Sequence, residues 1–177
     1  MKKSIYLLVL ILPIMSCANA SNTENNRQLS AGGDSTGKSA SAASGSNINI
    51  SNFSDIIGIE MKLIEVYIDG RNTNFNRNSL PQGLKDAYVI KFDEKIVSGM
   101  AAPNRFTAPY TLSDRYHLSI GLMATTMMAA FIEPENLKEY EFITYMQNTL
   151  SWMDENNHFV LSCKTAAGNE VKMIFEL

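Results

Sequence analysis

The sequence has few of the residues that mark specialised protein classes. It contains only two cysteines among 177 residues, too few for a disulfide-dense scaffold. Its 15 basic residues are outnumbered by 18 acidic ones, which argues against a dedicated nucleic-acid binder because phosphate contacts require clustered lysine and arginine. With 45% hydrophobic and 19% charged residues, the composition excludes a collagen, a coiled coil and a wholly disordered chain.

The sequence also lacks two frequent enzyme signatures. It contains no glycine fingerprint of a dinucleotide-binding fold and no HExxH zinc motif. The only histidines are His117 and His158, whose spacing suits no metal site, and we expect both side chains to be exposed to solvent. We therefore predict no catalytic residue, no bound metal and no cofactor, and we interpret the protein as a non-enzyme.

The N-terminal 16 residues have the pattern of a secretory signal peptide. Lys2 and Lys3 provide a positive start, and an apolar run of 11 residues follows from Ile5 to Met15. This run is half of the roughly 20 residues that a transmembrane helix needs. A signal peptide is therefore the better interpretation than a permanent membrane span.

Two cleavage sites follow this run. Ile14-Met15-Ser16-Cys17 resembles a bacterial lipobox, in which residues 1–16 are removed and Cys17 carries the lipid anchor. Ala18-Asn19-Ala20 instead fits ordinary signal peptidase and would release a secreted or periplasmic protein. We favour the lipoprotein because Cys17 stands at the end of the apolar run, separated from it by Ser16 alone. We prefer the outer membrane because Ala18 is not the aspartate that retains some lipoproteins at the inner membrane.

Residues 17–47 read as a lipidated cysteine followed by a disordered tether. From Ala18 to Asn47, 24 of 30 residues are Ser, Asn, Ala, Gly or Thr, and Leu29 is the only large apolar residue. Such a segment buries too little apolar surface to offset its chain entropy. We expect a flexible spacer on the order of 30 Å long between the lipid and the folded domain.

Residues 48–177 contain the folded domain. They hold 61 apolar residues and 15 of the 16 aromatic residues, enough for a single hydrophobic core. Their 11 basic and 16 acidic residues give a net charge of −5, which disfavours docking on anionic lipid. We expect a monomer that binds no nucleic acid and reaches the membrane through Cys17.

Alternating apolar and polar residues predict a mainly antiparallel sheet of short strands. The clearest period of two runs from Arg115 to Leu122. The imperfect alternation of Glu60–Ile68 is typical of a bulge, and we expect Gly99 to end its strand. The polar segment 71–82 reads as a long loop. Further strands are expected near residues 88–93, 106–112, 159–163 and 171–177.

One helix is expected within this sequence of strands. Glu133-Pro134-Glu135 is a favourable helix start, and residues 136–150 contain no glycine or proline. Helical spacing relates Ile143, Met146, Leu150 and Met153. Together these patterns predict an α+β fold with a bent, barrel-like antiparallel sheet and one α-helix packed on it.

The segment from Gly99 to Met146 carries a family resemblance. It holds a glycine, an asparagine followed by an aromatic residue and a tyrosine, a Thr-x-Met-Ala run and a Glu-x-x-Phe helix. These positions are Gly99, Asn104, Phe106, Tyr110, Thr126, Met128 and Glu139. The pattern resembles the META domain, which HslJ-like heat-shock proteins share, over residues 57–177.

The resemblance implies a compact β-rich fold with one helix and a place in the cell envelope. It also implies links to heat stress, novobiocin tolerance or secretion, without an established enzymatic activity. This sequence departs from many relatives at three positions. Pro103 and Ala130 replace a pair of cysteines, which removes any thiol chemistry of that pair, and Met61 stands where relatives often carry tryptophan.

The polar signature residues Asn104 and Thr126 allow two interpretations. They are either a pair that contacts a ligand or residues that bond turn and strand backbone, and we favour the structural interpretation. Four acidic residues near the helix start are better explained by interaction with the helix dipole and with solvent than by an acid/base pair or a metal site. They are Glu133, Glu135, Glu139 and Glu141.

The sulfur-containing residues of the domain allow similar alternatives. Met123, Met127 and Met128 either bind copper(I) or fill the core, and we favour core filling. Cys163 has no pairing partner once Cys17 is lipidated, and we expect it to be a buried apolar side chain.

These observations predict a non-enzymatic, membrane-anchored envelope lipoprotein. We expect partners among envelope proteins and a role in envelope maintenance or in stress and antibiotic tolerance. The alternative is a small barrel that binds a hydrophobic ligand, which the aromatic-rich strand pattern suggests.

Overall fold

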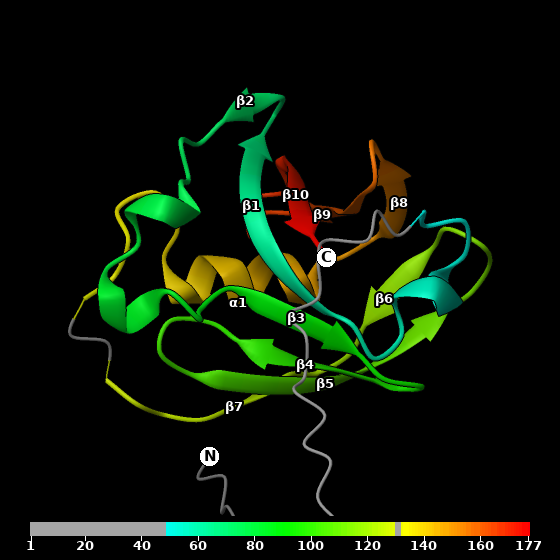
Figure 1. Cartoon of the computed structure of the whole chain (residues 1–177), viewed down its shortest axis with the longest axis horizontal. Helices are drawn as coiled ribbons and strands as arrows, with labels where there is room; N and C mark the ends of the chain where they lie inside the picture. Colours follow the sequence, from blue (N-terminus) through cyan, green and yellow to red (C-terminus); the bar gives the residue numbers. More distant parts are fainter. Residues whose placement is uncertain (1–48, 130–131) are drawn as a thin grey trace, which may run out of the picture. The chain divides into compact units, whose positions relative to one another are not determined.

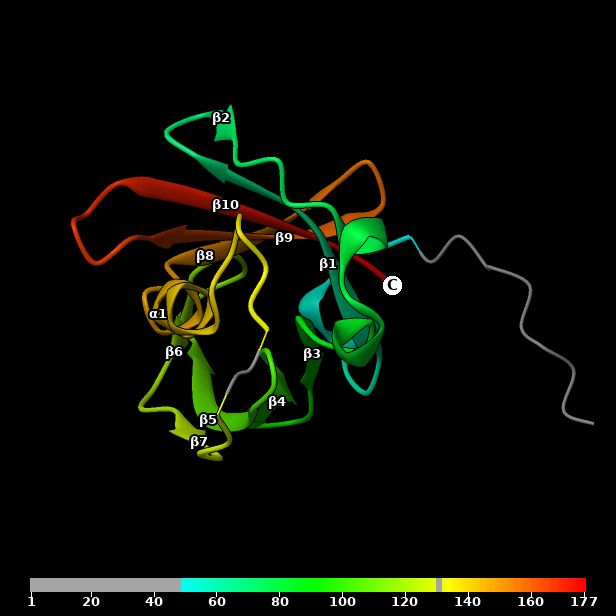
Figure 2. The same ribbon diagram turned by 90° about the vertical axis from the view of Figure 1, so that its left-hand side faces the viewer.

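A single curved sheet surrounds the hydrophobic core of the folded domain (Figures 1 and 2). The computed structural model describes residues 49–129 and 132–177. Within them the strands are β1 (Glu60–Ile68), β2 (Arg71–Asn72), β3 (Val89–Phe92), β4 (Ile96–Met100), β5 (Arg105–Leu112), β6 (Leu118–Ile120), β7 (Ala124–Thr125), β8 (Ser151–Glu155), β9 (His158–Lys164) and β10 (Glu170–Glu176). The helix α1 spans Glu139–Gln147, and short 3-10 turns lie at η1 (Phe53–Ile56), η2 (Arg77–Ser79) and η3 (Gln82–Leu84).

Several predicted features lie outside the described residues. These are the signal peptide at 1–16, the lipidation site Cys17, the tether at 17–47, the first domain residue Ile48, and Ala130. Within the part of the chain that the structure describes, no helix is long and apolar enough to cross a membrane.

The strand order is β6-β5-β4-β3-β1-β10-β9-β8, and neighbouring strands run antiparallel. Strand β1 joins the two halves of the sheet, because Glu60–Lys62 pair with β3 and Lys62–Ile68 pair with β10. The register with β10 shifts between Leu63 and Glu65, so the predicted bulge is confirmed. A bulge bends a strand, and β1 is the long curved strand at the centre of Figure 1.

The edge strands β6 and β8 meet and nearly close the sheet into a barrel. The Leu118 amide donates to the Leu150 carbonyl at 3.2 Å, and the Trp152 amide donates to the Tyr116 carbonyl at 2.9 Å. Between these bonds His117 pairs with Ser151 in an antiparallel bridge. The predicted α+β class with a barrel-like sheet is therefore right, although the sheet dominates the fold.

Aromatic side chains fill the interior of the barrel. The ring of Phe53 lies 5.1 Å from Phe92, 5.3 Å from Trp152 and 5.5 Å from Tyr110 between centroids. Phe159 stacks on Trp152 at 5.8 Å. Edge-to-face and offset contacts of this kind add to the stability that burial provides.

Helix α1 packs a second set of rings against the sheet. Phe142 is fully buried, 5.3 Å from the ring of Tyr88 and 5.9 Å from that of Phe106. In Figure 2 the helix is seen nearly end-on, next to β6 and β8. The buried residues of α1 are Phe142, Tyr145 and Met146.

The helix is shorter than the sequence pattern predicts. It begins at Glu139 rather than near Glu133, because Leu137 is buried and its carbonyl accepts a hydrogen bond from the Tyr88 hydroxyl at 2.7 Å. Lys138 is still extended, and its amide donates to the Glu141 carboxylate at 2.7 Å, which caps the first turn.

Beyond Gln147 the chain joins the sheet. The Leu150 amide donates to the Ser162 carbonyl at 2.8 Å, so Leu150 and Met153 lie outside the helix and are 49% and 39% exposed. Their helical spacing with Ile143 was therefore misleading.

Strand lengths also differ from the pattern. Gly99 does not end its strand, because β4 continues to Met100. The clearest alternation, Arg115–Leu122, yields only the three residues of β6. The outer part of that alternation is exposed, with Tyr116 at 49% and Leu122 at 88%.

The polar segment 71–82 is more ordered than a plain loop, and Arg77 explains why. Its guanidinium donates to the carbonyls of Leu63, Lys85, Ala87 and Tyr88 at 2.8–3.2 Å. Burial lowers the pKa of Arg77, partly opposed by Glu176 and other carboxylates. One cation thus ties the segment to the bulged part of β1 and to the start of β3.

Candidate functional site

The signature residue Asn104 lies at the centre of a polar cluster. It follows the turn between β4 and β5 and is only 7% exposed. Its Oδ1 accepts from the Thr126 hydroxyl at 2.8 Å and from the Met128 amide at 2.6 Å. Its Nδ2 donates to the Met128 carbonyl and to Oε2 of Glu139, both at 3.0 Å. The amide side chain therefore uses its full hydrogen-bonding capacity within the fold.

Thr126 and Glu139 complete this cluster. The Thr126 hydroxyl also accepts from the Arg105 amide at 3.1 Å, and the Arg105 carbonyl accepts from the Thr126 amide at 3.0 Å. Oε1 of Glu139 accepts from the Asn104 amide at 3.3 Å. The cluster thus joins the β4–β5 turn, the segment after β7 and the start of α1, which supports a structural role for these residues.

The other signature residues shape the sheet. A Cβ atom on Gly99 would overlap the Val89 carbonyl oxygen and lie 2.6 Å from Cζ of Phe106. Gly99 pairs with Phe106 across β4 and β5, so the missing side chain makes room for that ring. The Tyr110 hydroxyl donates to the Asp93 carbonyl at 2.7 Å, and burial raises the pKa of Tyr110.

A groove of about 610 Å³ lies beside the polar cluster. We call it the methionine groove; its lining residues are Asn104, Thr125, Thr126, Met127, Met128, Ala129, Glu133, Glu139, Tyr140, Ile143 and Thr144. Its volume falls within the range of about 300–1,000 Å³ typical of ligand sites. Its position beside the Asn104 cluster makes it the candidate site.

The methionines only partly behave as expected. Met123 is buried at 9% exposure, which fits core filling, but Met127 is 98% exposed and Met128 is 63% exposed. The core-filling interpretation is wrong for these two residues. The backbone of Met128 is fixed by Asn104, so its side chain is presented outward while its main chain is held.

The acidic residues serve different purposes. Glu139 binds Asn104 and Glu141 caps the helix, whereas Glu133 and Glu135 are exposed. Within residues 49–129 and 132–177, no three His, Cys, Asp or Glu side chains group in a way that suits a metal ion.

Comparison with known proteins decides the family. A family model described as META domain matches residues 61–175, about the whole of the barrel. The chain belongs to the META domain family. The resemblance seen at Gly99, Asn104 and the residues that follow is thereby confirmed.

The META domain of this chain is also similar to a solved structure. The NMR structure of a protein from Burkholderia xenovorans is 16% identical, with a TM-score of 0.48 over 80% of this chain and 97% of that chain. No curated protein matches the sequence.

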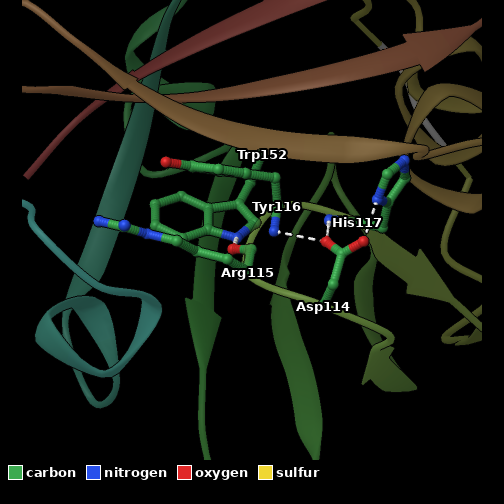
Figure 3. Close-up of polar contacts among 5 residues, drawn as sticks. All are labelled: Asp114, Arg115, Tyr116, His117 and Trp152. Atoms are coloured by element: carbon green, nitrogen blue, oxygen red, sulfur yellow. Dashed lines mark hydrogen bonds and ion pairs between the residues drawn. The ribbon is translucent and has the colours of Figure 1, made fainter.

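A second cluster of polar residues lies in the loop before β6, where β6 and β8 nearly close the sheet of the META domain (Figure 3). Oδ1 of Asp114 accepts from the amides of Tyr116 and His117 at 2.8 and 2.9 Å, and Oδ2 lies 2.6 Å from Nδ1 of His117. These bonds, the His117 amide foremost, lower the pKa of Asp114 to about 2. Nε1 of Trp152 donates to the Arg115 carbonyl at 2.9 Å. The group thus shapes the loop that closes the barrel.

The remaining candidates are placed as follows. His117 is exposed as expected, whereas His158 at the start of β9 is half-buried. Cys163 is 2% exposed, and burial raises the pKa of its thiol to about 12. The expectation of a buried, apolar Cys163 is therefore confirmed.

The segment 32–39 matches the sequence patterns of two enzyme motifs. Gly32–Ser39 fits the P-loop pattern GxxxxGK[ST], and Gly33–Gly37 fits the pattern GxSxG. Both motifs function only in a turn between a strand and a helix. Leu29 is the only large apolar residue nearby, and the segment lies outside both the described residues and the META match. We interpret both as chance matches in a Gly- and Ser-rich sequence.

Proposed function

We propose that this protein is a non-enzymatic, membrane-anchored envelope lipoprotein whose META domain serves envelope maintenance or stress and antibiotic tolerance. The observation that supports a non-enzymatic role is the use of the signature polar groups. Asn104, Thr126 and Glu139 bind one another and the backbone, so they stabilise the fold rather than face a substrate. The leader sequence and Cys17 support the anchor.

The experiment is a deletion strain complemented by the native gene and, separately, by the Cys17→Ala variant. We expect the deletion to lower survival after heat shock and in the presence of novobiocin, and native complementation to restore it. Cys17→Ala should release the protein from washed membranes and fail to complement. Full complementation by Cys17→Ala would contradict the anchored role, and an unaffected deletion strain would contradict the role in tolerance.

The alternative, a barrel that holds a hydrophobic ligand inside, has less support. Within the barrel the ring of Phe53 lies 5.1–6.2 Å from those of Phe92, Trp152 and Phe159, and the Phe159 ring lies 5.7 Å from Phe92 and 5.8 Å from Trp152. Because aromatic rings occupy this space, we do not propose an internal ligand.

A further inference from the structure

The exposed side of helix α1 borders two grooves rather than one. The methionine groove lies on one side of Tyr140, and a second groove of about 390 Å³, here called the hairpin groove, lies on the other. The β9–β10 turn supplies Thr165, Ala166 and Ala167 to the hairpin groove. Both grooves share Tyr140 and Thr144, which are four residues apart and therefore on one face of the helix. The two grooves form one surface with Tyr140 as a ridge.

Three large apolar side chains of this surface are exposed to solvent, beside polar ones such as Thr126 and Asn169. Met127 is 98% exposed, Met128 is 63% exposed and Tyr140 is 64% exposed. Scattered exposed apolar residues are ordinary, but a contiguous group marks an interaction site. Flexible methionine side chains adapt to varied partners, and grooves of this kind accept the apolar face of an amphipathic helix.

The charged side chains that line this surface have one sign. The charged residues that line the methionine groove are Glu133 and Glu139, and the charged residue that lines the hairpin groove is Glu141. Among the described residues, neither lining includes Lys, Arg or His. The complementary partner is therefore basic. A second copy docking by the same face would bring these carboxylates against each other, and an anionic lipid surface would be repelled.

We propose that the α1 face formed by the methionine groove and the hairpin groove binds a basic amphipathic segment of a partner protein. Apolar side chains of the segment contact Met127, Met128 and Tyr140, and its lysine or arginine side chains lie near Glu133 and Glu141. This adds a class of partner to the proposed function and does not depend on the lipid anchor.

The test uses the protein purified from membranes of the cells that express it and placed in nanodiscs of zwitterionic lipid. The probe is a fluorescent amphipathic helical peptide of leucine and lysine, and the matched peptide has glutamate in place of lysine. Fluorescence anisotropy should show that the lysine peptide binds at least about tenfold more tightly, with a loss of affinity at higher salt.

Surface variants locate the binding. Met127→Gln, Tyr140→Ser and Glu133→Lys should each weaken the lysine peptide at least about fivefold. The control is Ile96→Ser, which should leave the affinity unchanged. Ile96 is 49% exposed and begins β4, at the end of the strand away from the β4–β5 turn that leads to Asn104. Circular dichroism of each variant verifies that the fold is retained.

Four results would overturn the proposal. They are equal affinity for both peptides, an equal loss in Ile96→Ser, no detectable binding of the lysine peptide, and a concentration-dependent dimer that Tyr140→Ser abolishes. The last would assign the surface to a second copy. Because these measurements are made in vitro, their failure is distinguishable from failure of the complementation experiment.

Discussion

Asn104 and Glu139, 35 positions apart in the sequence, bind each other twice. The backbone amide of Asn104 donates to Oε1 of Glu139 at 3.3 Å, and its side-chain Nδ2 donates to Oε2 of Glu139 at 3.0 Å. Hydrogen bonds to a carboxylate are stronger than those between neutral groups. This pair fixes the start of α1 against the β4–β5 turn and so sets the wall of the methionine groove.

Replacing Asn104 should destabilise the domain. Asn104→Ala leaves the Met128 backbone and the Glu139 carboxylate without their partner, and we expect the free energy of unfolding to fall by about 3 kcal/mol. Urea unfolding followed by Trp152 fluorescence measures this. The control Asn78→Ala, at an exposed position, should change stability little. Equal midpoints for both variants would show that the cluster is not structural.

Gly99 should tolerate no side chain. In Gly99→Ala the new Cβ meets the Val89 carbonyl and the Phe106 ring, and we expect a loss of about 2–3 kcal/mol. Gly83→Ala is the matched control, because its Cβ would meet nothing within 4 Å. Thermal unfolding of the two variants compares them, and a native melting temperature in Gly99→Ala would contradict the close contact.

Arg77 should contribute more than an ordinary surface arginine. Arg77→Ala removes hydrogen bonds to the Leu63, Ala87 and Tyr88 carbonyls, and we expect a loss of about 2 kcal/mol. Arg71→Ala, at an exposed position of β2, changes the net charge equally and should be nearly neutral. Similar urea midpoints for the two variants would disprove the bridging role.

Ionisation of Asp114 should stabilise the folded state, and this stabilisation should be lost in acid. Its folded pKa of about 2 lies below its usual 3.8, so its contribution is present above the usual value and is lost as pH falls through about 2. NMR titration of the Asp114 carboxyl should show this midpoint. His117→Ala should retain most of the depression, because backbone amides are its largest causes. A return to the usual value would assign the effect to the imidazole instead.

Cys163 should be unreactive in the folded chain. Raising a thiol pKa from 9 to about 12 lowers the thiolate fraction about a thousandfold. Mass spectrometry of the Cys163 peptide after iodoacetamide treatment should show labelling only in denaturant, whereas an added cysteine in Ser113→Cys should react at once. Rapid native labelling of Cys163 would contradict its burial.

Part of the candidate site could be predicted from the sequence. The residue types and spacing of Gly99, Asn104, Thr126 and Glu139 indicated the family. Their contacts were not predictable, because the bonds of Asn104 join residues 22 to 35 positions apart. The exposure of Met127 was also missed, since an apolar residue type predicts burial unless the surrounding surface is known.

The sequence by itself determined the strand-rich character of the domain, the bulge in β1 and the presence of one helix. It also predicts the division into leader, tether and domain. These features depend on local periodicity and composition. Only the tertiary structure decided where α1 begins, how short β6 is, which carbonyls Arg77 binds and which methionines face solvent. The physical reason is competition: burial of Leu137, the Tyr88 hydrogen bond and pairing with β9 outweigh local helix propensity, and their energies come from residues distant in the chain.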